Sequence, residues 1–340
     1  MQETLTISVS EAREIVSAAM IGQGTAPDNA ASVADALVAA EVDGQAGHGL
    51  SRVASYAVQV ASGKVDGRAR PVILDATAVA LRIDAANGFA YPALDLARHE
   101  VCGRASDAGI AVATICRSHH FGQAGYQVER VAGDGLIGLL FGNSPKAIAP
   151  WGGSSGVFGT NPIACAFPRG NAPPLVIDLS LSKVARGQVM VAAREGRPIP
   201  EGIALDSAGN PTTDATAALD GTMVPMGGAK GYPLVLMVEI LSAALAGANF
   251  GFEASSYFTP DGPPPGVGQT LLAFEPDRLS GGRFFDRLEV LIDAILSQDG
   301  TRLPGSRLAA RRQAAEQHGI TVRADLLSEI RALAPGERGA

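Results

Sequence analysis

The chain has 340 residues, of which 46% are hydrophobic and 18% are charged, and its formal net charge at pH 7 is -7. This size and composition are typical of a globular protein with one large core or two moderate ones, and they argue against extended disorder. The negative balance of charge offers no electrostatic attraction for nucleic acid or for an anionic membrane surface, so we expect a small-molecule partner.

Targeting and metal-binding signals are missing from the sequence. The N-terminal "MQETLTISVS" has no basic flank followed by an apolar core, and the longest apolar segment, residues 232–250, is interrupted by Glu239, which favours a buried helix over a membrane span. Cys102, Cys116 and Cys165 are far apart, and no His-x-x-x-His or Glu-x-x-His pattern occurs. We therefore expect reduced thiols, no metal site and a cytoplasmic protein.

The first third of the chain is predicted to be mainly helical and then to alternate with strands. Ser8 and Glu11 form a capping box before the first helix, and two further helical patterns end near Gly44 and Gly63. Beyond about Arg70, runs rich in β-branched residues predict strands, with helical stretches between them. The strand runs are residues 76–84, 109–117, 136–143 and 174–180, and the helical stretches are residues 91–109 and 125–133.

The second half of the chain contains two turn-rich segments. Residues 194–231 are rich in Pro, Gly and polar residues, which predicts a long loop without regular elements and therefore a functional loop. Residues 259–269 form the second such run, and residues 306–334 return to a helical pattern. We expect a helical body built from both chain ends around a central α/β region, with divisions at residues 1–72, 73–265 and 266–340.

A glycine pattern raises the question of a Rossmann nucleotide site. Gly133, Gly135 and Gly138 satisfy GxGxxG, but the segment upstream has helical periodicity and the segment downstream is a strand-like apolar run. The Rossmann fingerprint requires the reverse order, because the pyrophosphate binds at the N-terminus of the following helix. These glycines are predicted to end a helix, with Gly133 as its C-cap, and to start a strand.

His48 and Arg52 form the first candidate catalytic pair. If a helix includes both, they lie one turn apart on one face. Arg52 can bind a carboxylate bidentately while His48 protonates a neighbouring carbonyl oxygen, which suits a 2-oxo acid. The alternative is that His48 caps a helix end and Arg52 extends into solvent.

A second candidate region begins with His119 and His120, which follow a strand and precede a helix. Consecutive side chains diverge, so we expect at most one of these histidines in a site. Gly122 lies in the first turn of the helix, where backbone N–H groups can bind an anion or a ribose.

Further candidate groups lie at strand ends and glycine-rich turns. Residues 227–231 contain three glycines and Lys230 just before the apolar helix, an arrangement that can receive a phosphate although it is not a Walker A sequence. Asp178 closes an apolar strand, where its carboxylate can accept from a ribose hydroxyl, orient a catalytic histidine or cap a helix.

Ordered blocks along nearly the whole chain resemble the malate/L-lactate dehydrogenase type 2 family of NAD(P)-dependent oxidoreductases. The blocks are "HGLSRV", "HHFGQAGY", "GNSPKAIAPWGG", "FGTNPIACAFP", "VIDLSLSKVARG", "GIALDSAGNPTTDATAAL", "PMGGAKGYPLVLMVEIL" and "RLPGSR". The resemblance implies an α/β (α+β) fold with a non-Rossmann cofactor domain, in which a mostly antiparallel mixed sheet is joined to a helical domain from both chain ends. It also implies NAD or NADP as cofactor and a homodimer.

The resemblance further implies hydride transfer to or from a small 2-oxo acid or 2-hydroxy acid of the malate, lactate or sulfolactate type. The alternatives are reduction of a cyclic imino acid and a cofactor-binding protein that has lost catalysis. It assigns His48 and Asp178 to catalysis and Arg52, His120 and Thr160 to the substrate. Cofactor-binding residues are expected at His120, Phe121, Gly122, Ser144, Pro145, Gly159, Thr160, Asn161, Pro162, Asp178, Leu179, Ser180, Gly227, Gly228, Lys230 and Gly231.

Two positions depart from the family pattern. Gly47 stands where the family commonly has Ser before the catalytic histidine, and Gln188 stands where Lys commonly follows "ARG". Gly47 removes a hydroxyl that could contact substrate or cofactor, so it leaves the identity of the substrate open. The sequence around His48 is most similar to the sulfolactate dehydrogenase branch.

Overall fold

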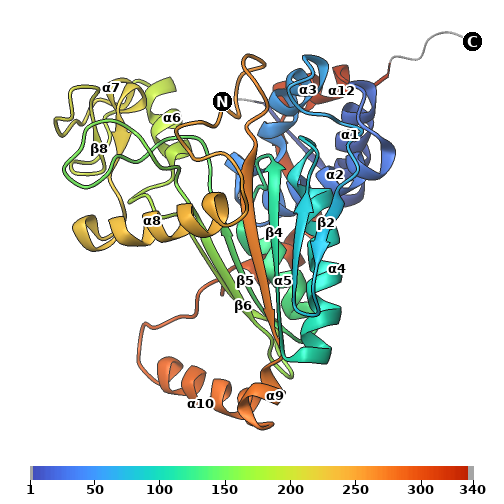
Figure 1. The fold of residues 1–340 in the computed structure, drawn as a ribbon. Coiled ribbons are helices and arrows are strands. Elements are labelled where there is room, and N and C mark those ends of the chain that lie inside the picture. The colour runs from blue at the N-terminus through green and yellow to red at the C-terminus, as the bar shows by residue number, and fades with distance from the viewer. Residues whose placement is uncertain (1–2, 336–340) are drawn as a thin grey trace, which may run out of the picture.

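The structure is a computed structural model that describes residues 3–335, and its centre is a seven-stranded sheet (Figure 1). The strand order is β2-β3-β4-β10-β5-β6-β7, and every neighbouring pair is antiparallel except β3 and β4. The strands are β2 (Val72–Ala76), β3 (Ala80–Asp84), β4 (Ile110–Ser118), β5 (Ile137–Gly142), β6 (Ile163–Phe167), β7 (Leu175–Leu179) and β10 (Val267–Phe274). An α/β chain with a mainly antiparallel sheet is therefore confirmed.

Strand β10 lies at the centre of the sheet and is covered on both faces. Leu271 pairs with Ala113 of β4 on one side and with Leu140 of β5 on the other. Helices α4 (Ala90–Ala108) and α5 (Ala124–Gly133) cover one face, where they share a buried core with the strands. On the opposite face, the Thr270 hydroxyl donates to the Leu241 carbonyl (2.6 Å) in the helical segment after α8. The domain boundary expected at residue 266 thus falls just before the central strand of the sheet.

The two chain ends pack together beside the sheet (Figure 1). Strand β1 (Thr4–Ile7) pairs antiparallel with β11 (Ile320–Arg323), and five helices surround this pair. These helices are α1 (Val9–Gly22), α2 (Pro27–Val42), α3 (Val53–Ala61), α11 (Leu308–His318) and α12 (Ala324–Ala332). Ser8 caps α1 by accepting from the Glu11 N–H (3.0 Å), as its capping box predicted. A continuous helical pattern over residues 306–334 is wrong, because Gly319 at φ 78° ends α11 and the following β-branched residues pair with β1.

The turn-rich segment at residues 194–231 contains regular elements, so the expectation of a plain loop is wrong. It follows α6 (Arg186–Arg194) and contains β8 (Ala204–Leu205), α7 (Ala215–Asp220) and β9 (Thr222–Met223), with β8 paired to β9. Asp214 starts α7 because its carboxylate accepts from the N–H groups of Thr216 and Ala217. Buried apolar residues from this segment join a third core with residues of α8.

The GxGxxG stretch lies between a helix and a strand, as predicted. Helix α5 ends at Gly133 and β5 begins at Ile137. The C-cap is Asp134, and the residue with positive φ is Gly135 (84°), so the assignment of the cap to Gly133 is wrong. The helix-before-strand order excludes a Rossmann phosphate turn at these glycines.

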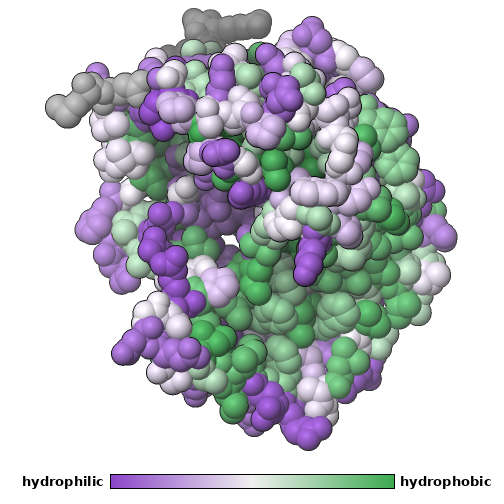
Figure 2. Space-filling view, turned by 90° about the vertical axis from the view of Figure 1, so that its left-hand side faces the viewer, coloured by the Kyte–Doolittle hydropathy of each residue, from purple (hydrophilic) through white to green (hydrophobic). Residues whose placement is uncertain are grey.

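The apolar segment at residues 232–250 is not one buried helix. It forms α8 (Tyr232–Glu239), continues as one turn of π-helix (Ile240–Ala244) and leaves an apolar face in solvent, with Ile240 50% and Leu245 57% exposed. Figure 2, which looks at the side of the molecule carrying α8, shows a broad hydrophobic surface. None of the helices within residues 3–335 combines the length and the apolar character that a bilayer span needs.

Two helices extend from the main body below the sheet (Figure 1). They are α9 (Pro276–Ser280) and α10 (Phe284–Leu296). Arg169 anchors α10 through a bidentate pair with Glu289 (2.8 and 2.7 Å). Val290 and Leu291 are exposed on α10, so this arm presents a second apolar surface.

Candidate active site

His48 and Arg52 lie on two short 3₁₀ turns before α3. The turns are Ala46–His48 and Leu50–Arg52, so the single helix expected to carry both residues is broken at Gly49. The break is caused by Glu41, whose carboxylate accepts from the Leu50 N–H (2.9 Å) and lies where a Cβ on residue 49 would be. The Arg52 Nε–H donates to the Gly47 carbonyl (2.6 Å), which brings the guanidinium back beside His48.

His48 is joined to His120, which comes from the distant turn after β4. The His48 Nδ1 and His120 Nε2 atoms are 3.3 Å apart, and the two rings are stacked with an interplanar angle of 12°. The other ring nitrogen of His120 hydrogen-bonds to the Tyr56 hydroxyl (2.6 Å), which in turn contacts the Tyr91 hydroxyl (3.0 Å). This chain of four groups occupies Nδ1 of His48, so its Nε2 is the nitrogen available to a substrate.

His119 takes no part in the contact between His48 and His120, although its ring lies against Tyr56 and Tyr257 as the His120 ring does. Its Nε2 contacts the Gln59 Oε1 atom (3.0 Å), and its backbone carbonyl accepts from the Gln269 side chain (3.3 Å). Tyr257 packs against both neighbouring histidines, with ring centroids 5.1 Å from His119 and 5.2 Å from His120. His119 therefore supports the site from behind.

Arg52 is the charge that dominates this site. Its Nη1 atom is buried and has no hydrogen-bond partner within the described part of the chain. Burial, followed by the nearby Arg52 guanidinium, lowers the pKa of His48 to about 4, and burial with the Lys64 and Arg52 charges lowers the pKa of His119 to about 3. The site thus combines neutral histidines with an unpaired cation, an arrangement that fits an anionic ligand.

The segments expected to form the cofactor wall come together around Thr160. The Thr160 N–H donates to the Ser144 hydroxyl (3.1 Å), and the Thr160 carbonyl accepts from the Leu181 N–H (2.9 Å). Leu181 in turn accepts from the Met226 N–H (2.8 Å), which brings residues 227–231 to the same region. Gly159 approaches Ser144 so closely that a Cβ would overlap the Ser144 hydroxyl and carbonyl.

The remaining residues expected in this wall lie on the same segments. Pro145 follows Ser144, Asn161 and Pro162 follow Thr160, Leu179 is the last residue of β7, and Ser180 follows it. Phe121 and Gly122 continue from His120, with the Phe121 ring packed against Gly142. Gly227 and Gly228 have positive φ (73° and 59°), and Lys230 is exposed before Gly231 and α8.

Asp178 does not hydrogen-bond to a histidine in residues 3–335. Its carboxylate accepts from the Gly125 N–H (2.7 Å) at the start of α5, so it caps a helix across 53 positions of the chain. This contact fits the capping alternative, although with a different helix from the one expected, and a catalytic role of Asp178 stays a prediction. Burial raises the pKa of Asp178, and the Gly125 N–H partly offsets this effect.

Glu239 is a site residue that the sequence-based assignment missed. Its buried carboxylate accepts from Asn143 (3.1 Å), Asn161 (2.7 Å) and the Gly251 N–H (2.7 Å), and burial raises its pKa. It thereby ties the end of α8 to the loops after β5 and before β6. The sequence signal that could have identified Glu239 is a single carboxylate in an apolar run. The π-helical turn that follows it is a second indication, because such turns frequently occur at functional sites.

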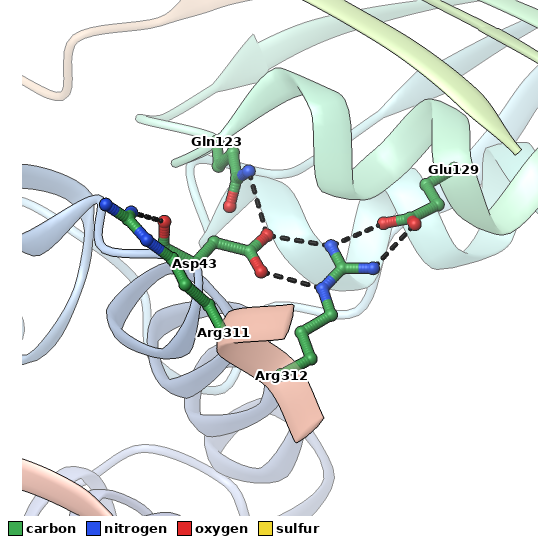
Figure 3. A network of polar contacts seen from close by, with 5 residues as sticks. All are labelled: Asp43, Gln123, Glu129, Arg311 and Arg312. Carbon is green, nitrogen blue, oxygen red and sulfur yellow. Dashed lines mark hydrogen bonds and ion pairs between the residues drawn. The ribbon is translucent and has the colours of Figure 1, made fainter. Parts of the chain in front are cut away.

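A charged network fixes the two histidine turns relative to each other (Figure 3). Arg312 of α11 binds Asp43 with two hydrogen bonds (2.7 and 2.8 Å) and Glu129 of α5 with two more (2.6 and 2.8 Å). Asp43 also accepts from Gln123 (3.1 Å), and its backbone carbonyl accepts from Arg311 (2.7 Å). Asp43 precedes the His48 turn and Gln123 follows the His120 turn, so α11 connects both.

Comparison with known proteins places this site in a family. The sequence profile of malate/L-lactate dehydrogenase matches residues 7–331. The chain belongs to the malate/L-lactate dehydrogenase family. It is an oxidoreductase of this family, as its ordered motifs indicated.

Family members that are named for different substrates are similar to the chain. It is 48% identical to (2R)-3-sulfolactate dehydrogenase (NADP(+)) of Chromohalobacter salexigens over 96% of the chain and 98% of that protein. It is 40% identical to a Δ1-pyrroline-2-carboxylate/Δ1-piperideine-2-carboxylate reductase of Pseudomonas syringae pv. tomato, covering 98% and 97%.

Solved structures agree with the fold. The crystal structure of the P. syringae Δ1-piperideine-2-carboxylate reductase superposes with a TM-score of 0.92 at 39% identity, covering 97% of this chain and all of that one. Sulfolactate dehydrogenase of Methanocaldococcus jannaschii superposes with a TM-score of 0.89 at 28% identity, covering 97% and 96%.

Proposed function

We propose that the chain is an NAD(P)-dependent enzyme that transfers a hydride between the nicotinamide and a small 2-oxo or 2-hydroxy acid at His48 and Arg52. The observation that carries this proposal is the unpaired, buried Nη1 of Arg52 beside the His48–His120 pair. Burying a guanidinium nitrogen without a partner is costly, and a substrate carboxylate supplies the missing acceptor.

Arg52 and His48 then have separate roles. Arg52 binds the carboxylate and fixes the adjacent carbonyl carbon, while His48 presents Nε2 toward the carbonyl oxygen. His48 donates a proton to that oxygen during reduction and accepts it back during oxidation. The hydrogen bonds of His120 and Tyr56 keep the His48 ring in this orientation.

The wall around Thr160 fits a nicotinamide cofactor. Gly159 brings the backbone of this turn into direct contact with Ser144, where a Cβ would overlap, and Asn161 has a buried amide oxygen without a partner in the described region. We assign Ser144, residues 159–162, residues 178–180 and residues 227–231 to this wall. When bound, the nicotinamide supplies or accepts the hydride. The mostly antiparallel sheet supports a binding mode without a Rossmann unit.

Reduction of a cyclic imino acid is the second candidate, because several relatives at 33–40% identity are Δ1-pyrroline-2-carboxylate reductases. Such a substrate carries the same carboxylate for Arg52. The position of Gly47 does not decide between the two, since no atom lies within 4 Å of a Cβ there. Gln188 is exposed on α6.

We further propose a cytoplasmic homodimer in which residues 1–72 form one helical domain with α11, β11 and α12 of the C-terminal division, residues 266–340. The exposed apolar faces of α8 and α10 support association with a second copy, because large apolar patches usually mark interfaces. Light scattering that gives 34.7 kDa, the mass of a single chain, at working concentration would argue against a dimer.

The decisive experiment is a substrate panel. Pyruvate, oxaloacetate, sulfopyruvate and the two cyclic imino acids are each tested with NADH and NADPH, following loss of the reduced-nicotinamide absorbance. Turnover of an oxo acid supports the main proposal, and turnover of only the imines supports the second. Cofactor binding without turnover of any of them would indicate a non-catalytic protein.

A further inference from the structure

The loop at residues 255–263 is an ordered wall of the active site, although the sequence marked only its second half, as part of a turn-rich run. It lies between the π-helical turn and β10, and its side chains Tyr257 and Phe258 reach the residues of the site. Ser255 closes the loop internally by donating to the Pro263 carbonyl (2.6 Å). The loop is thus an organised surface element and not a simple connection.

Lys64 holds this loop through three backbone carbonyls. Its ammonium donates to Ser256 (2.7 Å), Thr259 (2.9 Å) and Asp261 (2.8 Å). An ammonium has three N–H donors, so the loop uses all of them, and Lys64 is only 3% exposed. A buried lysine that donates all its hydrogen bonds to one loop stabilises the conformation of that loop.

Two side chains of α3 and its C-terminus add weaker contacts to the same loop. Gln59 donates to the Tyr257 carbonyl (2.8 Å), and Ser62 donates to the Pro260 carbonyl (3.2 Å). Since α3 follows Arg52 directly, the loop is fixed to the element that carries the candidate carboxylate ligand.

The loop presents two aromatic rings to the site. The Phe258 ring lies 4.6 Å from the Arg52 guanidinium carbon and covers one face of it, while Gly47 occupies the Nε side. Nη1 is buried without a partner, and Nη2 makes no hydrogen bond within residues 3–335 either, so these two nitrogens are the donors left for a carboxylate. The buried Tyr257 hydroxyl has no hydrogen-bond partner in residues 3–335, although its ring is held against His119 and His120.

We propose that Tyr257 and Phe258 are specificity-determining residues of this enzyme and that Lys64 is the positioning residue that holds them there. Phe258 limits how the substrate carboxylate approaches Arg52, and Tyr257 offers its hydroxyl to the polar part of the substrate. Lys64 acts through the loop and does not contact the substrate. The proposal rests on the oxo-acid or imino-acid activity proposed above.

The test compares Lys64→Met, Lys64→Arg and Phe258→Leu, with Ser62→Ala as the matched control that removes one exposed hydrogen bond to the same loop. We expect Lys64→Met to raise KM for the best substrate about tenfold or more, with kcat and NADPH affinity changed less than about threefold. Hydrogen exchange of the loop peptide should become faster. Lys64→Arg should recover part of the loss, and Ser62→Ala should stay within about twofold of wild type.

Phe258→Leu separates a direct role from a structural one. Phe258 is 43% exposed, so this variant should fold even if Lys64→Met does not, and its loop exchange should match wild type. Its KM should rise, and its ratio of kcat/KM between a cyclic imine and pyruvate should change about fivefold or more. Wild-type KM and wild-type selectivity in Phe258→Leu would overturn the proposal.

The test also distinguishes failure of this proposal from failure of the proposed activity. If the wild-type protein turns over no substrate on the panel, oxamate serves as an unreactive carboxylate probe with the shape of a 2-oxo acid. Slower exchange of the loop peptide with oxamate, lost in Phe258→Leu, would support the wall without the activity. If oxamate gives no protection, both the proposed loop wall and the proposed oxo-acid activity are contradicted.

Discussion

Replacing Arg52 with Gln tests the assumption that Arg52 binds the substrate carboxylate. The guanidinium has one face on Phe258 and its Nε on Gly47, and neither Nη1 nor Nη2 has a hydrogen-bond partner in residues 3–335, so a carboxylate can form two charge-assisted hydrogen bonds to these nitrogens. Hydrogen bonds to charged groups contribute about 1.5–3 kcal/mol each, so losing the pair predicts a decrease in kcat/KM of roughly 100-fold or more. The carboxylate does not change during the reaction, so the loss should be mainly in KM.

The same substitution should change the titration of His48. Burial is the larger cause of its low pKa and Arg52 is the second, so removing the cation raises the pKa from about 4 while burial still keeps it below 6.5. The pH at which reduction loses activity as His48 gives up its proton, and the NMR titration of His48, should therefore move to higher pH. Arg52→Lys separates the two effects, because the ammonium keeps the charge but not the planar fork.

The controls define what would refute this reasoning. Arg13 forms an exposed pair with Asp35, so Arg13→Gln makes the same chemical change away from the histidines and should leave KM and the titration of His48 unaltered. If Arg52→Gln retains the wild-type KM in folded enzyme, the carboxylate does not bind there. An unshifted titration of His48 in the same variant would show that the two side chains are not coupled.

Four further outcomes follow from the structure. His48→Asn should lower kcat by about 100-fold or more with cofactor affinity within about twofold, and a wild-type kcat at saturating substrate would redirect attention to His120. Arg312→Met leaves the buried Asp43 carboxylate without its main partner and should lower the free energy of unfolding by about 3 kcal/mol in urea titrations, less if solvent reaches the site. Gly159→Ala should weaken NADPH binding measured by fluorescence by about tenfold or more, because the new methyl group overlaps Ser144; unchanged affinity would exclude this turn from the cofactor wall. Finally, burial holds the pKa values of these histidines below 6.5 in the folded state, so the unfolded state takes up more protons as the pH falls below 6.5. The free energy of unfolding should therefore decrease between pH 6.5 and about 4, by up to about 1.4 kcal/mol per pH unit for each histidine. A flat stability profile in this range would contradict burial of the histidines as neutral imidazole.

The parts of the site that were predictable are those encoded by local spacing or by an ordered motif. His48 and Arg52 are four residues apart, so any helical turn brings them together, although the break at Gly49 depends on the side chain of Glu41. Strands such as β4 and β5 were predictable because β-branched and apolar runs of the right length produced them. The short strand β11 was missed because its four residues lie inside a longer helical pattern.

The parts that were not predictable depend on contacts between distant segments. His120 meets His48 across 72 positions, and Lys64 reaches the loop at residues 255–263 across more than 190 positions. The periodicity of the sequence does not predict these contacts between distant residues, because they depend on how β10 and the terminal helices pack. Asp178 shows the same limit, since its type and position suited three roles and only the tertiary structure placed it at α5.

The low pKa of His48 and its proposed role as an acid are compatible because the free site and the occupied site differ in charge. In the free site, burial and the Arg52 cation both disfavour imidazolium, so His48 is neutral at physiological pH. A substrate carboxylate at Arg52 offsets the cation and makes a proton on His48 less costly, and negative charge that develops on the carbonyl oxygen favours that proton further. Binding of an anionic substrate should therefore be accompanied by uptake of a proton. An uncharged molecule that enters the site leaves the Arg52 charge unbalanced and His48 unprotonated, so the same guanidinium that selects the carboxylate also prevents proton transfer to a ligand without one.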